Sequence, residues 1–176
     1  GYILDVRRKI FKRAHAAAKI GELRVACESV ALSLEIWPEN LSALALLCSL
    51  CLQPNPNMDL FPTCRELEKQ FRQREQSQPL ALLLCALSAL AERASDSETA
   101  EAHLAEALRL LPEDPQVVEW VAGAYVRLAR FEAAVALLHQ FVERLRASGQ
   151  ASALPSLARA ELLLAGLHSE VLVQPD

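Results

Sequence analysis

Residues 107–115 read Ala-Leu-Arg-Leu-Leu-Pro-Glu-Asp-Pro. The spacing predicts an apolar helix that ends before Pro112, because proline cannot continue a helix, and a second helix that begins at Pro115. The two acidic residues between the prolines form a tight turn. This stretch is therefore predicted to join two antiparallel helices, and it also closes one copy of an internal repeat.

The repeat is visible in the spacing of small and apolar residues that precede Pro112. In this segment they are Leu84, Leu87, Ser88, Ala91, Ala100, Leu104, Ala107 and Leu110. The residues 34 positions later are Val118, Val121, Ala122, Tyr125, Ala134, Leu138, Phe141 and Arg144. The residues 74 positions earlier are Ile10, Arg13, Ala14, Ala17, Ala26, Val30, Ser33 and Ile36, with Pro38 in the place of Pro112. A fixed period indicates a solenoid, and one intervening copy carries about six extra residues.

The pattern resembles the tetratricopeptide repeat, a pair of antiparallel helices in 34 residues. The small residues of its first helix correspond to Ala14, Cys48, Ser88 and Ala122. The alanines of its second helix correspond to Ala26, Ala100 and Ala134, and the prolines that end that helix to Pro38 and Pro112. The turn glycine is kept at Gly21 but is Ser95 and Ala129 in later copies, and the family's tryptophan is absent from every copy.

The resemblance implies an all-α fold, a right-handed superhelix of about four helix pairs with a C-terminal capping helix. We expect one domain over 1–176, with repeats at 7–40, 41–80, 81–114 and 115–148 and the cap at about 152–167. The repeat at 41–80 is degenerate and holds the insertion. Solenoid ends need a cap because their last apolar face would otherwise meet water.

Composition agrees with an all-helical chain, since Leu and Ala are strong helix formers. Net charge is −4, so a general affinity for nucleic acid is not expected. The uncharged runs 41–52 and 80–91 are too short to span a membrane. Charges crowd the first 13 residues, so no signal peptide is predicted. Because residue 1 is Gly, a processed chain or a fragment is one expectation.

Helix boundaries follow from caps and breakers. Helices are predicted over 2–19, with a turn at Gly21, and over 22–36 and 41–52, the last capped by Asn40. The prolines in 53–59 predict an irregular segment. Capping boxes are predicted at Thr63 with Glu66 and at 95–98, with a helix start near Ser97. Pro79 and Pro115 are predicted to open helices, residues 147–150 to end one, and residues 171–176 to be loose.

The cysteines and histidines give no signature of an active or metal site. Five cysteines is an odd number without a secreted disulfide pattern, so a cytoplasmic location is predicted. Cys48 and Cys51 have a metal-like spacing but occupy small packing positions, where cysteine acts as a small hydrophobe. The histidines lack a metal-binding spacing, and no phosphate loop or nucleophile elbow occurs. We expect no metal, no cofactor and no catalysis by this chain.

The predicted function is a protein–protein interaction module that binds a peptide or helix of a partner, possibly an acidic one, in a concave groove. Charged or polar groove positions are predicted at Arg8, Lys12, His15, Lys19, Gln53, Glu92, Arg93, Trp120 and Arg127. A mostly apolar middle is predicted from Ala45, Ser49 and Ala89. The alternative for the basic residues is a solvated face, and the alternative for Trp120 is a contact between repeats. Trp37 is predicted to pack between repeats.

Three further alternatives remain open at this point. The chain could be a secretion-type chaperone, a non-catalytic regulatory domain of a larger enzyme or assembly, or a module that forms a homo-oligomer. One known subfamily clamps a C-terminal carboxylate with lysines and asparagines on its first helices. Those asparagines are missing here, so that activity is not predicted.

Overall fold

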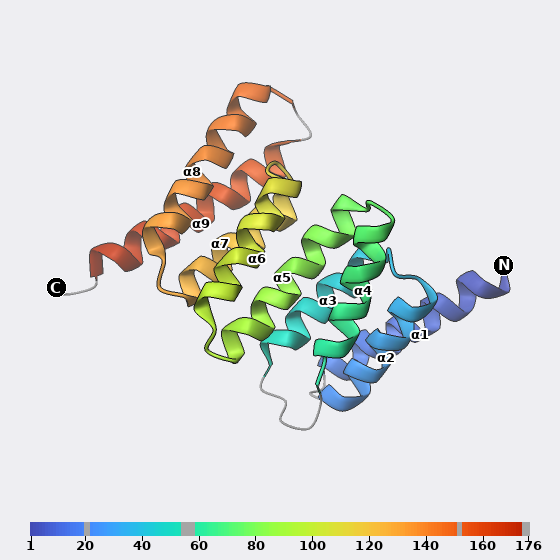
Figure 1. The fold of residues 1–176 in the computed structure, drawn as a ribbon. Helices are drawn as coiled ribbons and strands as arrows, with labels where there is room; N and C mark the ends of the chain where they lie inside the picture. The colour runs from blue at the N-terminus through green and yellow to red at the C-terminus, as the bar shows by residue number, and fades with distance from the viewer. Residues whose placement is uncertain (20–21, 54–58, 151–152, 174–176) are drawn as a thin grey trace. The chain divides into compact units, whose positions relative to one another are not determined.

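This computed structural model describes residues 1–19, 22–53, 59–150 and 153–173, and every regular element in them is a helix (Figure 1). In chain order the helices are α1 (Tyr2–Lys19), α2 (Leu23–Ile36), α3 (Leu41–Leu52), α4 (Phe61–Gln73), α5 (Ser77–Arg93), α6 (Ser97–Leu110), α7 (Pro115–Arg127), α8 (Phe131–Ser148) and α9 (Leu154–Val173). The prediction of an all-α chain is confirmed for these residues.

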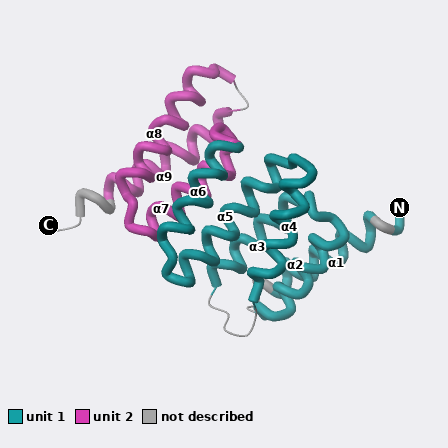
Figure 2. Tube along the Cα trace, viewed as in Figure 1, with its two compact units in different colours: residues 1–110 teal, residues 111–176 magenta. Residues whose placement is uncertain are grey.

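The chain divides into two compact units, Gly1–Leu110 and Leu111–Asp176 (Figure 2). The first unit holds α1 to α6 and the second holds α7 to α9. The boundary falls inside the stretch 107–115 from which the register was read. A proline turn can therefore serve both as the end of a repeat and as a division between packed groups of helices.

The core of the first unit is built around α5. This helix packs against α3, α4 and α6, while α1 packs on α2 and α2 on α3. Every residue from Pro79 to Ala89 is buried, because three neighbours leave the helix no solvated stripe. Ser88, a polar residue in this core, donates a hydrogen bond from Oγ to the Ala100 carbonyl at 3.0 Å.

The second unit packs α7 on α8 and α8 on α9. Its buried side chains include Val121, Leu138 and Phe141, and α9 contributes Ala160, Leu164 and Leu167. The C-terminal helix was predicted over about 152–167. The structure extends its backbone to Val173, so the prediction of a loose tail was wrong for residues 171–173.

The offsets of 34 and 74 recur in the backbone turns between paired helices. The N–H of Glu22 donates to the Ala17 carbonyl at 2.9 Å, that of Asp96 to Ala91 at 2.9 Å, and that of Arg130 to Tyr125 at 2.7 Å. These bonds close helix C-termini in the Schellman manner. The architecture is therefore repeat-like in its backbone as well as in its sequence.

Helix N-caps recur at the same offset. The side chain of Asn40 accepts from the Ala43 N–H at 3.2 Å, and that of Asp114, 74 residues later, accepts from the Val117 N–H at 3.1 Å. The Asn40 cap was predicted, and so was the helix start at Pro115 that Asp114 caps; an Asn or Asp before a helix supplies an acceptor for its free N–H groups.

The cap predictions failed in and next to the irregular second copy. Thr63 lies inside α4, and the N–H of Phe61 instead donates to Asp59 at 3.0 Å. Pro79 is the third residue of α5, not its first. The helix start near Ser97 is confirmed, but its cap is Asp96, which accepts from the Thr99 N–H at 3.1 Å. Gly21 and residues 54–58 lie outside the described residues.

The turns use left-handed residues that are not glycine. Ser95 has φ 60° and Ala129 has φ 59°, at the two positions where the family's glycine is replaced. A Cβ atom disfavours this conformation by about 1–2 kcal/mol. Gly149, at the end of α8, has φ 59° and meets no such cost.

We therefore expect Ala129→Gly to raise the free energy of unfolding by about 0.5–1 kcal/mol. Gly149→Ala should lower it by a similar amount, since both changes act on the same backbone region. The measurement is urea denaturation followed by circular dichroism. The control is Ala133→Gly in α8, which should destabilise by up to about 1 kcal/mol. If Ala129→Gly destabilises as the control does, Ala129 is not under backbone strain.

Candidate functional site

The residues that were predicted to bind a partner lie in both units. Arg8, Lys12 and His15 are exposed on α1, and they are spaced to share one face of this helix. The backbone of Lys19 ends α1, while its side chain lies outside the described part of the chain. Of the four residues predicted for the groove on this helix, the structure therefore describes three side chains on one face.

The charge of α1 is strongly one-sided. It contains one acidic residue, Asp5, and the basic residues Arg7, Arg8, Lys9, Lys12, Arg13 and Lys19. Asp5 pairs with Lys9 at 3.7 Å. Arg8 and Lys12 have no acceptor or carboxylate partner among the described residues.

Arg7 has a structural role. Its guanidinium carbon lies 5.2 Å from the centre of the Trp37 ring, which is a cation–π distance. This contact joins α1 to the residue that follows α2, so Trp37 makes a contact within its own predicted repeat. Arg7 is thereby distinguished from Arg8 and Lys12, which face solvent.

The predicted residues at the ends of α3 and α5 are held by contacts within the unit. Arg93 donates from Nη1 to the Cys51 carbonyl at 3.4 Å, and Gln53 follows the last turn of α3. Glu92 is half-buried. Ala45 is half-buried and Ser49 exposed, but Ala89 is buried, so it cannot contribute to an exposed groove as predicted. It lies in the fully enclosed part of α5.

Trp120 and Arg127 lie on α7 in the second unit. Trp120 is half-buried, and Arg127 is exposed. A Cβ atom placed on Gly123 would lie 3.7 Å from Nη1 of Arg127, so the guanidinium extends back over the helix at this glycine. Both residues therefore belong to one helix of the second unit.

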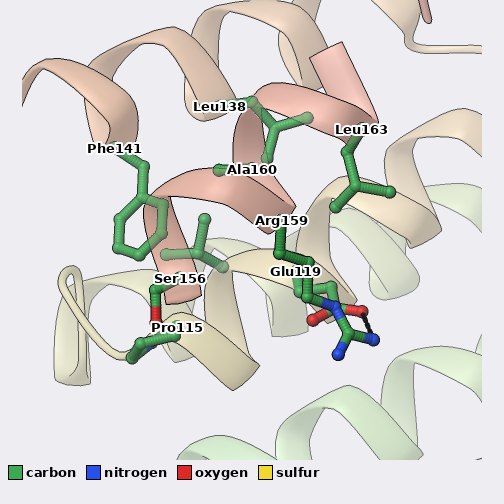
Figure 3. Close-up of a pocket in the computed structure, with 9 residues that line it drawn as sticks. Pro115, Glu119, Leu138, Phe141, Ser156, Arg159, Ala160 and Leu163 are labelled. Carbon is green, nitrogen blue, oxygen red and sulfur yellow. Dashed lines mark hydrogen bonds and ion pairs between the residues drawn. The ribbon is translucent and has the colours of Figure 1, made fainter. Parts of the chain in front are cut away.

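The second unit also contains a narrow pocket between α7, α8 and α9 (Figure 3). Leu138, Phe141 and Ala160 line it, and an ion pair between Arg159 and Glu119 at 2.6 Å lies beside it. Its space is about 40 Å³, enough for a water molecule or two. A pocket of this size is a packing gap and not a binding site for an organic ligand.

The five cysteines are buried free thiols. A hydrogen bond with Cys64, together with burial, raises the pKa of Cys51 far above its usual range. The site therefore favours the neutral thiol, whereas a metal ligand or nucleophile must be a thiolate. In the described part of the chain, no three His, Cys, Asp or Glu side chains are placed to hold a metal ion together.

A charge network on α4 and α6 was missed by the sequence analysis. Arg72 donates to both carboxylate oxygens of Glu106, at 2.6 and 2.9 Å, and also to Glu68 at 3.3 Å. Arg65 pairs with Glu68 at 2.9 Å from the same helix. Arg72 and Glu106 lie on different helices, and the second copy is irregular, so this pair became visible only in the packing.

The network shifts the titration of its members. The hydrogen bonds from Arg72 lower the pKa of Glu106. Burial lowers the pKa of His103, which faces Glu68, Glu106, Arg65 and Arg72. The arrangement is a cross-link between two helices.

Comparison with protein-family models, curated proteins and solved structures finds no match for this chain. Across the described residues, no helix has both the length and the apolar character that crossing a bilayer requires.

The Arg72–Glu106 pair leads to a pH-dependent prediction. A carboxyl whose pKa is lowered by folding stabilises the protein above its unfolded pKa, about 4.3 for Glu, and loses this effect as the pH falls through the folded value. At pH 7 we expect Glu106→Gln to lower the free energy of unfolding by about 0.5–1 kcal/mol. The difference from wild type should shrink below a pH of about 4.

Urea denaturation at several pH values measures this difference. Glu143→Gln, at an exposed carboxylate on α8, is the control and should change stability little at any pH. If the Glu106→Gln difference is the same at pH 7 and pH 3, the ion pair does not stabilise the fold.

The cysteine contacts lead to a second prediction. Elemental analysis of untagged protein should find far less than one zinc per chain. Cys51 and Cys64 are hydrogen-bonded to each other as buried thiols, whereas zinc binds thiolates. One zinc per chain that is lost in a Cys51→Ala variant would contradict a purely structural role for these thiols.

Proposed function

We propose that this protein is an interaction module of the tetratricopeptide-repeat kind, which binds a peptide or helix of a partner protein. The observation that carries the proposal is the recurrence of turns and caps at offsets of 34 and 74. Stacked helix pairs create an extended surface that many repeat proteins use for binding. The right-handed superhelix of such proteins is part of the proposal.

In the first unit the groove would be lined by the first helix of each pair, α1, α3 and α5, and the second unit would contribute α7. In the first unit these helices are neighbours, because α3 packs directly on α5 and α1 also contacts α3. This order supports a surface on which residues from successive repeats lie side by side. Lys12 on α1 and Ser49 on α3 are both exposed, so this surface would offer a cation from one repeat and a small polar residue from the next.

Charged and apolar side chains would contribute to binding in different ways. Exposed cations raise the association rate more than the affinity, and salt weakens their effect. A tryptophan contributes through the large area that it buries. On this basis Lys12 and Lys19 steer the partner, and Trp120 contributes to the strength of binding.

The test is affinity capture from the source cell, followed by kinetics with the captured protein. Lys12→Glu combined with Lys19→Glu should slow association about tenfold at low salt and flatten its salt dependence. Trp120→Ala should weaken binding by about 1–2 kcal/mol. Circular dichroism checks that both variants fold.

Two outcomes would contradict the proposal. One is that no protein is captured. The other is that affinity, rate and salt dependence are unchanged in every variant, which would place the binding surface elsewhere. Capture of one small secreted protein would favour the chaperone alternative.

A further inference from the structure

The exposed face of α1 carries basic side chains in its middle and large apolar side chains at its N-terminal end. Leu4, Arg8 and Lys12 are spaced four residues apart, so they form one row along the helix. Leu4 is 54% exposed and Tyr2 is 84% exposed, so two large side chains at this end of α1 lie largely in solvent. These two residues, with Asp5 and Arg8, line an open hollow at this end of α1.

The N-terminal turns of α1 project beyond α2. Arg7 stacks on Trp37, the residue that follows the end of α2. Figure 1 shows the N-terminal end of α1 extending past α2. No residue of α2 is left to cover Tyr2 and Leu4. The row therefore combines a free apolar end with cations that have no carboxylate partner in the described chain.

We propose that this row binds an acidic segment of another protein, with carboxylates on Arg8 and Lys12 and an apolar side chain against Leu4 and Tyr2. The inference rests on the proposed function, and it adds the chemistry of the partner. A helix that carries a leucine and glutamates at four-residue spacing would match the row, because each four-residue step is about 6 Å along both helices.

A membrane surface is a poorer match. An interfacial helix buries its whole apolar face among lipid headgroups. The apolar face of α1 is already used inside the protein, where Ala14 and Ala17 are buried in its packing against α2. Two exposed side chains at one end give little area for insertion.

Nucleic acid is also a poorer match. A duplex presents phosphates continuously, and its binding needs basic surface over a long path. The chain as a whole has a net charge of −4 although α1 carries six basic residues and one acidic residue. The rest of the chain would therefore repel a long polyanion. A short acidic segment can contact α1 without approaching these other charges.

The probe is a synthetic helix-forming peptide of about 16 residues, with leucine and glutamates at the proposed spacing and a fluorescent label. Fluorescence anisotropy measures its binding to the full chain at about 0.02 M and about 0.15 M salt. Arg8→Glu with Lys12→Glu should weaken binding about tenfold, and Leu4→Ala should also weaken it. Lys12→Arg should retain binding, because it keeps the charge.

The matched control is Lys69→Glu, which reverses an exposed lysine on α4 and should leave binding unchanged. A second peptide with lysines in place of the glutamates should not bind. The proposal is overturned if the lysine peptide binds equally well, if the double variant binds as wild type does, or if the control loses as much as the double variant. It is also overturned if phosphatidylserine vesicles or a DNA duplex bind in place of the peptide.

The captured partner distinguishes this inference from the proposed function. If that protein binds wild type and the Arg8→Glu, Lys12→Glu variant equally, the acidic-segment inference fails while the interaction module stands. If no protein is captured, the proposed function itself fails.

Discussion

The architecture depends on one type of backbone hydrogen bond, which recurs at the turns α1–α2, α5–α6 and α7–α8. It joins a backbone N–H to a carbonyl five residues earlier, from Glu22 to Ala17, from Asp96 to Ala91 and from Arg130 to Tyr125. The bond satisfies a helix-end carbonyl and reverses the chain within a few residues. Short reversals hold the two helices antiparallel, and so the small residues of one helix can pack against the alanines of the other.

Side-chain contacts also join helices of successive copies. The bidentate ion pair between Arg72 and Glu106 links α4 to α6. Glu68 adds a second carboxylate to the same arginine and strengthens the link within α4.

The sequence predicted those features whose chemistry is local or periodic. Asn40 and Asp114 cap helices through their own side chains, so the boundaries near them could be read directly. Thr63 and Pro79 were misplaced because the second copy is irregular and gives no period against which to align them. The burial of Ala89 depends on three neighbouring helices, which a single stretch of sequence does not reveal. The exposed row on α1 could be predicted from its spacing, but its apolar end became visible only in the packing of α1 on α2.

The position of α4 has a consequence for the motions of the first unit. It packs on α5, while α3 makes its own direct contact with α5. Local unfolding of α4 can therefore occur while α3 and α5 stay together. Such an opening would uncover Cys64 and its partner Cys51, which are inaccessible in the closed state. The rate at which these two thiols react with a labelling reagent therefore reports how often α4 opens.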